Sequence, residues 1–113
     1  MLLIDVVCKR LGARVFLESG CFRCHIQPEH PEVGSKLQLV TEIVTDPPKN
    51  QGDEGVYQYE ANPAKVFIQK RVSDFLPFNR ALRIGLLKQS DGTYEIRSFY
   101  PANGWPSKGV IPL

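Results

Sequence analysis

The sequence has few of the features that define several protein classes. Its longest apolar runs fall well short of the ~18 residues of a membrane-spanning helix, and Asp5 interrupts the N-terminal apolar run, which no basic residue precedes. We therefore expect neither a membrane span nor a signal peptide. The chain has only three cysteines among 113 residues, so a disulfide framework is not expected. These absences favour a cytoplasmic protein, and the length fits a single domain over residues 1–113.

The net charge of +2 is too small to indicate a nucleic-acid-binding protein by itself. The distribution of charge along the chain is more informative. Residues 1–64 hold six Lys and Arg against nine Asp and Glu, whereas residues 65–113 hold eight against three. A basic half can bind a phosphate backbone if its charges gather on one surface. The alternative is a solvated sheet face on which Lys and Arg protect the edge strands.

The first half of the chain predicts a hairpin followed by a helix. Residues 2–8 and 13–17 are short β-rich runs on either side of a turn at Gly12. Residues 35–45 fit a helix, which Ser35 can cap and which the Asp-Pro-Pro at 46–48 ends, since a residue before proline disfavours the helical region. One apolar stripe follows the helical period: Leu37, Val40, Ile43 and Val44.

The second half of the chain is rich in strand-forming residues. Asp91-Gly92 is a strong hairpin signal between the last two strands. Uninterrupted alternation would put one set of side chains, Tyr94, Ile96, Ser98 and Tyr100, on one face and another set, Glu95, Arg97 and Phe99, on the other. The loop at 73–78, with Phe75 and Phe78, covers either a site or the core. The fold class that follows is α+β, with a short N-terminal hairpin and helices packed on an antiparallel sheet of about four strands. The four expected strands are 56–60, 65–72, 80–88 and 93–100.

The segment CFRCHIQPEHPE, residues 21–32, allows three interpretations. Its Cys-x-x-Cys-His start is typical of covalent haem attachment, but the only methionine available as an axial ligand is Met1. Cys21, Cys24, His25 and His30 are zinc ligand types, with Cys8 as a substitute, but adjacent residues cannot easily both point at one ion. In the third interpretation the cysteines are buried apolar residues, and the histidines move protons without a metal.

Five segments, taken in order, resemble one known family. His25-Ile26 with His30-Pro31-Glu32 is similar to the HIxxxHPE signature of phage-associated nucleases of the BECR fold, the barnase, EndoU, colicin and RelE-like group of small ribonucleases. A helix with a Pro end, a basic strand, a DG-x-Y-x-I-x-S-x-Y strand and a KG-x-(V/I) end follow, as in that family. The resemblance covers about residues 17–113. The later segments are LQLVTEIVTDPP, KVFIQKR, DGTYEIRSFYP and SKGVI.

This resemblance implies a metal-independent endoribonuclease, toxin-like or phage-associated, that cleaves RNA through attack of the 2′-hydroxyl and needs no cofactor. RNA is the implied partner, with a protein inhibitor or antitoxin as a second one. The catalytic residues that it implies are His25, His30, Lys70, Ser98 and Tyr100. The RNA-binding residues are Arg71, Arg83, Arg97 and Lys108.

Two alternatives remain at the level of the sequence. Pro28 stands between the two histidines, where a proline removes a backbone donor and bends or ends a helix. Together with the modest net charge, this favours a non-catalytic RNA- or protein-binding module on the same fold. A small zinc-binding domain is the remaining alternative.

Overall fold

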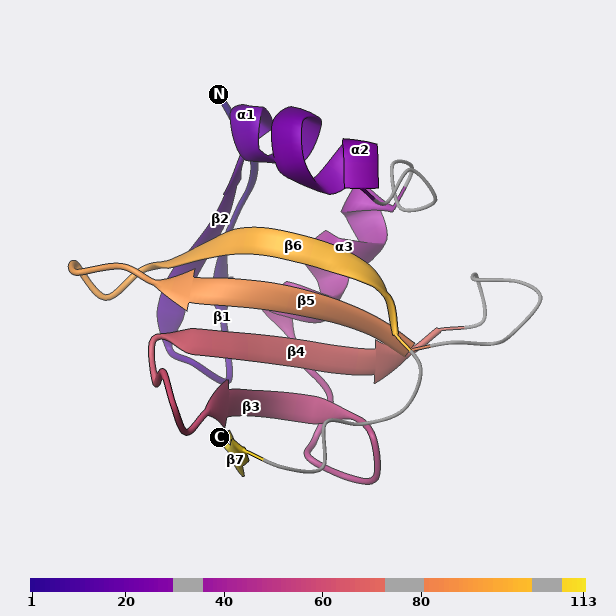
Figure 1. Ribbon diagram of the computed structural model, residues 1–113, viewed down its shortest axis with the longest axis vertical. Coiled ribbons are helices and arrows are strands. Elements are labelled where there is room, and N and C mark those ends of the chain that lie inside the picture. The colour runs from indigo at the N-terminus through magenta and orange to yellow at the C-terminus, as the bar shows by residue number, and fades with distance from the viewer. Residues whose placement is uncertain (30–35, 73–80, 103–108) are drawn as a thin grey trace.

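The computed structural model describes residues 1–29, 36–72, 81–102 and 109–113. Its strands form one sheet in the order β1-β2-β6-β5-β4-β3-β7 (Figure 1). Two short helical segments accompany the sheet. The first is continuous from α1 (Ser19–Cys21) through a π-helical turn, η1 (Phe22–Ile26), to α2 (Gln27–Glu29), and the second is α3 (Leu37–Thr45). The strands are β1 (Leu2–Cys8), β2 (Ala13–Glu18), β3 (Gly55–Tyr59), β4 (Lys65–Arg71), β5 (Ala81–Lys88), β6 (Tyr94–Ala102) and β7 (Val110–Pro112).

The expected fold class is wrong in its sheet. The described strands make a seven-stranded mixed sheet, not an antiparallel sheet of about four strands beside a separate hairpin. The difference arises where β2 pairs in parallel with β6, with Val15 opposite Tyr94 and Phe16 opposite Glu95. A hairpin leaves backbone N–H and C=O groups unpaired along both of its edges. Here β6 pairs with the β2 edge of the hairpin. Because β2 and β6 are far apart in sequence, no local sequence pattern predicts that they pair.

The local elements agree with the sequence more closely. β1 and β2 form the expected antiparallel hairpin, and α3 ends at Thr45, just before Asp46-Pro47. Val40, Ile43 and Val44 of its apolar stripe are buried. The expected cap, Ser35, lies outside the described residues, as does the loop at 73–78.

The main core lies on one face of strands β3–β6. Figure 1 shows α3 behind these strands and the β1–β2 hairpin crossing behind them, with α1, η1 and α2 above. Phe22 of η1 stacks on Phe99 of β6, with ring centroids 5.9 Å apart. The opposite face of β3–β6 has no helix over it in the described part of the chain. That open face is where the polar and aromatic side chains of these strands gather. The other face of these strands contributes a row of side chains to the main core: Val56, Val66, Ile68, Leu82, Ile84, Leu86, Ile96 and Phe99.

A β-bulge in β6 changes which side chains reach the open face. Gly85 pairs with Ser98, but its neighbour Leu86 pairs with Ile96, so Arg97 is an additional residue in the strand. As a result Ile96 and Phe99 both point into the core, while Ser98 is turned to the open face. The expectation of uninterrupted alternation, with Ser98 on the face of Ile96, is therefore wrong.

Candidate functional site: the groove on the open sheet face

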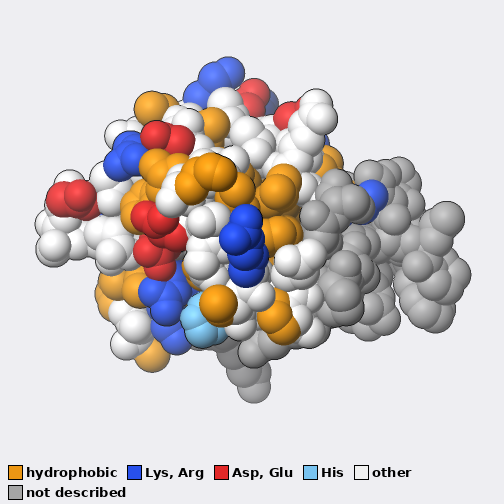
Figure 2. Space-filling model, turned by 90° about the horizontal axis from the view of Figure 1, so that it is seen from above, with side chains coloured by type: hydrophobic (Ala, Val, Ile, Leu, Met, Phe, Trp, Pro, Cys, Tyr) orange, Lys and Arg blue, Asp and Glu red, His pale blue; other side chains and the backbone are white. Residues whose placement is uncertain are grey.

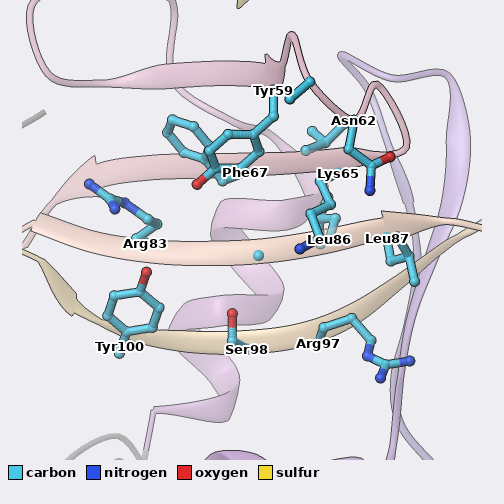
Figure 3. A pocket seen from close by; sticks show the side chains of 13 residues that line it. Tyr59, Asn62, Lys65, Phe67, Arg83, Leu86, Leu87, Arg97, Ser98 and Tyr100 are labelled. Carbon is cyan, nitrogen blue, oxygen red and sulfur yellow. The ribbon is translucent and has the colours of Figure 1, made fainter. Parts of the chain in front are cut away.

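A groove of about 660 Å³ lies on the open face of β3–β6. Figure 3 shows Arg83 and Tyr100 at one end, Lys65 and Leu87 at the other, and Ser98 between them on β6. The described residues that line the groove include three cations and no Asp or Glu. They are Tyr59, Ala61, Asn62, Lys65, Val66, Phe67, Arg83, Gly85, Leu86, Leu87, Arg97, Ser98 and Tyr100.

Gly85 makes the floor of this groove. It sits in the middle of β5, between Phe67 on β4 and Ser98 on β6. A Cβ at position 85 would lie 2.5 Å from the Ser98 hydroxyl oxygen, and every other heavy atom near it lies at 3.8 Å or more. Glycine weakens a strand interior and often marks a place where another group approaches the backbone closely. Here it leaves a hollow between larger neighbours.

An aromatic cluster forms one wall of the groove. The Phe67 ring is stacked with the Tyr57 ring at 5.6 Å between centroids and tilted against the Tyr59 ring at 5.5 Å. Phe67 is 1% exposed although it does not face the main core. Burial raises the pKa of the Tyr57 hydroxyl. The cluster is a second, smaller apolar centre on the outer side of the sheet.

Arg83 is held in a fixed position above this cluster. Its guanidinium carbon lies 5.3 Å from the centroid of the Phe67 ring, a cation–π arrangement. Its Nε donates a 2.8 Å hydrogen bond to Oε1 of Gln69. Gln69 is fully buried, and its amide nitrogen donates to the backbone carbonyl of Asp53 at 3.0 Å. Among the described residues the Arg83 guanidinium donates only through Nε, so within this part of the chain the two Nη groups can donate to a ligand.

The loop before β3 supports this chain of hydrogen bonds. Asp53 forms a two-pronged ion pair with Arg71, with Nη2 to Oδ2 at 2.6 Å. Asn50 accepts from and donates to the backbone of Val56. Gly55 has φ of 136° and lies against Asn50 so closely that a Cβ there would be 2.7 Å from the Asn50 Cα. The loop therefore requires glycine at this position.

The other two cations of the groove differ in their surroundings. Arg97 pairs with Glu95 on its own strand at 2.7 Å, so part of its charge is already neutralised. Lys65 is exposed, and within the described residues neither Lys65 nor Arg83 has an acidic partner. The groove thus combines unneutralised positive charge with aromatic walls.

Four of the residues expected from the sequence come together here: Arg83, Arg97, Ser98 and Tyr100. Lys70 and Arg71 do not join them. Arg71 is engaged with Asp53, which makes it a support of the loop. Lys70 pairs with the buried Leu82 across the strands, in the row that faces away from the groove.

The histidine segment lies away from the groove. His25 is exposed on η1 and does not line the groove, while His30 and Lys108 fall outside the described residues. The Cys21 thiol donates toward the carbonyl of Ile96 at 3.5 Å, and burial raises its pKa. Cys24 is exposed and Cys21 is half-buried, so the expectation that both cysteines are buried is wrong.

Sequence reasoning missed the residues that give the groove its shape. Lys65, Tyr59 and Phe67 lie on expected strands, where the pleat places Lys65 and Phe67 on the face opposite the core residues Val66 and Ile68. Gly85 inside the apolar run of β5 is a further signal, because a lone glycine in a strand marks a bulge or a close approach. The β-bulge at Arg97 of β6 lies directly beside Gly85, where the register between β5 and β6 shifts.

Other surfaces of the described chain are less distinctive. Figure 2 looks down on α1, η1 and α2, where acidic, basic and hydrophobic side chains are intermixed. Among the described residues, no three His, Cys, Asp or Glu side chains are grouped as metal ligands would be. None of the helices in this part of the chain has the length and apolar character needed to cross a membrane.

Comparison with known proteins found no match: no family model matches the chain, and neither a curated protein nor a solved structure does. The likeness to BECR-fold nucleases therefore remains a prediction from motifs.

Proposed function

We propose that the protein binds single-stranded RNA in the groove on the open face of β3–β6. The proposal depends above all on Arg83, a guanidinium fixed by Phe67 and Gln69 in a groove whose described lining has no acidic residue. A guanidinium presents a planar set of donors that matches two phosphate oxygens at once. Holding it in place before binding lowers the entropy lost on binding.

The aromatic and apolar surface beside Arg83 favours a single strand over a duplex. Single-stranded binders combine a positive groove for the backbone with aromatic side chains on which bases stack. Tyr59 and Tyr100 are half-buried and line the groove with Lys65 and Arg83. In a duplex the bases are stacked inside and do not reach such a surface.

RNA is preferred to DNA in this proposal because of the motif likeness to small ribonucleases, which covers about residues 17–113. The hydroxyls of Ser98 and Tyr100 line the groove and can hydrogen-bond a 2′-hydroxyl, which DNA lacks. A cytoplasmic location, as the sequence predicts, is part of the same proposal.

Fluorescence anisotropy with an end-labelled octanucleotide tests the proposal. Wild-type protein should bind single-stranded RNA more tightly than the same RNA as a duplex, and more tightly than DNA of the same sequence. Arg83→Gln should weaken RNA binding at least about tenfold, since a charge-assisted contact contributes roughly 1.5–3 kcal/mol. Arg14→Gln is the matched control, because Arg14 lies outside the groove and pairs with Asp5. Equal affinity of the Arg83 variant and wild type would contradict the proposal.

RNA cleavage in the same groove is the second candidate. The observation that favours it is the gathering of two hydroxyls, Ser98 and Tyr100, with the cations Arg83 and Lys65. In this reaction the 2′-oxygen bonds to phosphorus as its proton passes to a base. The bond from phosphorus to the 5′-oxygen breaks, and an acid protonates that oxygen. The cations stabilise the negative charge that develops on the phosphorane.

Incubation with labelled RNA in excess EDTA separates binding from cleavage. Products with 2′,3′-cyclic phosphate and 5′-hydroxyl ends support cleavage, and Tyr100→Phe should then lower the rate by about 10²-fold if its hydroxyl transfers the proton. Binding without such products leaves the binding function and rejects metal-free cleavage.

A further inference from the structure

We infer that the hollow above Gly85 holds one nucleobase of the bound strand, so that the groove recognises a base as well as the backbone. This inference rests on the proposed RNA-binding function and deepens it.

The dimensions of the hollow follow from the register of the strands. Gly85 faces Phe67 on one side and Ser98 on the other, each one strand spacing of about 4.8 Å away. Along β5, Arg83 and Leu87 stand two residues to either side, so they are about 14 Å apart. The floor residue between these four side chains has no side chain of its own, and the Ser98 hydroxyl leans over it, 2.5 Å from where a Gly85 Cβ would lie. The groove volume of about 660 Å³ is in the range of pockets that hold small organic ligands.

The chemistry around the hollow is suited to a flat, mostly apolar group with polar edges. Phe67 and Leu87 provide apolar walls, and no charged residue stands at the floor. Ser98 adds a hydroxyl that can donate or accept a hydrogen bond at the edge of an inserted ring. A base placed there would find both apolar contact and a polar partner.

The cations lie where the phosphates of that nucleotide would be. Figure 3 shows Arg83 at one end of the groove and Arg97 at the margin on β6, while the Lys65 side chain extends from β4 toward Leu86 on β5. A strand whose base enters the hollow would extend its backbone toward these cations. The arrangement therefore separates base contact at Gly85 from phosphate contact at Arg83 and Lys65.

Filling the hollow tests the inference directly. Leucine at position 85 would occupy it, and the nearest atom to the new Cβ is the Ser98 hydroxyl oxygen, so Ser98→Ala removes that close contact. The comparison is between Ser98→Ala, in which the hollow is open, and Gly85→Leu/Ser98→Ala, in which it is filled. We expect the filled variant to bind the RNA octanucleotide at least about tenfold more weakly, since a stacked base contributes to binding on that scale. Both should bind inorganic polyphosphate equally, because the cations are intact.

A second measurement uses wild-type protein and does not depend on the folding of any variant. An abasic analogue of the octanucleotide keeps the phosphates and removes the bases, and it should bind at least about tenfold more weakly than the RNA. If the abasic strand and the RNA bind equally, or if filling the hollow has no effect on RNA binding, the base site is wrong while RNA binding stands. If wild-type protein binds no RNA at all, the proposed function fails and this inference fails with it.

Discussion

The buried side chain of Gln69 fixes the position of Arg83: its Oε1 accepts a 2.8 Å hydrogen bond from the Arg83 Nε. Gln69 in turn donates to the carbonyl of Asp53, so the loop before β3 is connected to the cation in the groove.

Gln69→Leu should therefore affect both stability and binding. Leucine keeps the buried volume but leaves the Asp53 carbonyl and the Arg83 Nε without their partner, which costs about 1–3 kcal/mol. Urea unfolding should show this loss, and RNA affinity should fall several-fold because Arg83 is no longer held. Gln38→Leu, at an exposed position of α3, is the control. If RNA affinity is retained in folded Gln69→Leu, Gln69 does not position Arg83 for binding.

The salt dependence of RNA binding should report the number of groove cations that meet phosphates. For a single strand the slope of log K against log salt concentration is about −0.7 for each phosphate neutralised. Lys65→Gln should reduce the steepness by about 0.7, whereas Lys49→Gln, at an exposed position outside the groove, should not change it. An unaltered slope in Lys65→Gln would exclude a phosphate contact at that side chain.

His25→Ala should leave RNA affinity within about twofold of wild type. The motif likeness implies a catalytic role for His25, but the side chain is exposed on η1 and does not line the groove. Anisotropy with the same octanucleotide measures this, with Arg83→Gln as the positive control. A tenfold loss in His25→Ala would show that the binding surface extends to η1.

Stability should fall at alkaline pH in part because of Cys8. Burial raises the pKa of its thiol in the folded protein, above the unfolded value of about 8.5. The folded state then retains a proton that the unfolded state has lost, so this contribution is complete below pH ~8.5 and disappears as pH rises through the folded pKa. Cys8→Ala lowers stability at every pH through lost packing, but its unfolding free energy should decline less steeply above pH ~8.5. Cys24→Ala, at an exposed position, should decline as wild type does.

Gly55→Ala should destabilise the protein by about 2 kcal/mol or more. Its φ of 136° is unfavourable for alanine, and the new Cβ would lie 2.7 Å from the Asn50 Cα, which is backbone and cannot move aside cheaply. Gly52→Ala is the matched control, with φ of 62° and no heavy atom within 4 Å of the Cβ. The difference between their unfolding free energies measures the combined cost of the contact with Asn50 and of the φ of 136° at position 55. Equal values would show that the loop adjusts without cost.

The local elements could be predicted because their causes are local. β-rich runs beside Gly12 predict the hairpin, helical spacing of Val40, Ile43 and Val44 predicts α3, and Pro47 predicts its end. These interactions join residues that are close in sequence, so they depend little on how the rest of the chain folds. The family resemblance implied Arg83, Arg97, Ser98 and Tyr100 as site residues, and these four line one groove; their role there stays a prediction.

The gathering of those residues was decided by the tertiary structure. A single additional residue at Arg97 reverses the faces of β6 beyond it, so Ser98 leaves the core side and joins Arg83. The pairing of β2 with β6 depends on hydrogen bonds between segments about eighty residues apart, which no period in the sequence records. The sequence by itself determined which segments are strands, and the register between them determined that a buried glutamine, a glycine floor and an aromatic wall meet in one groove.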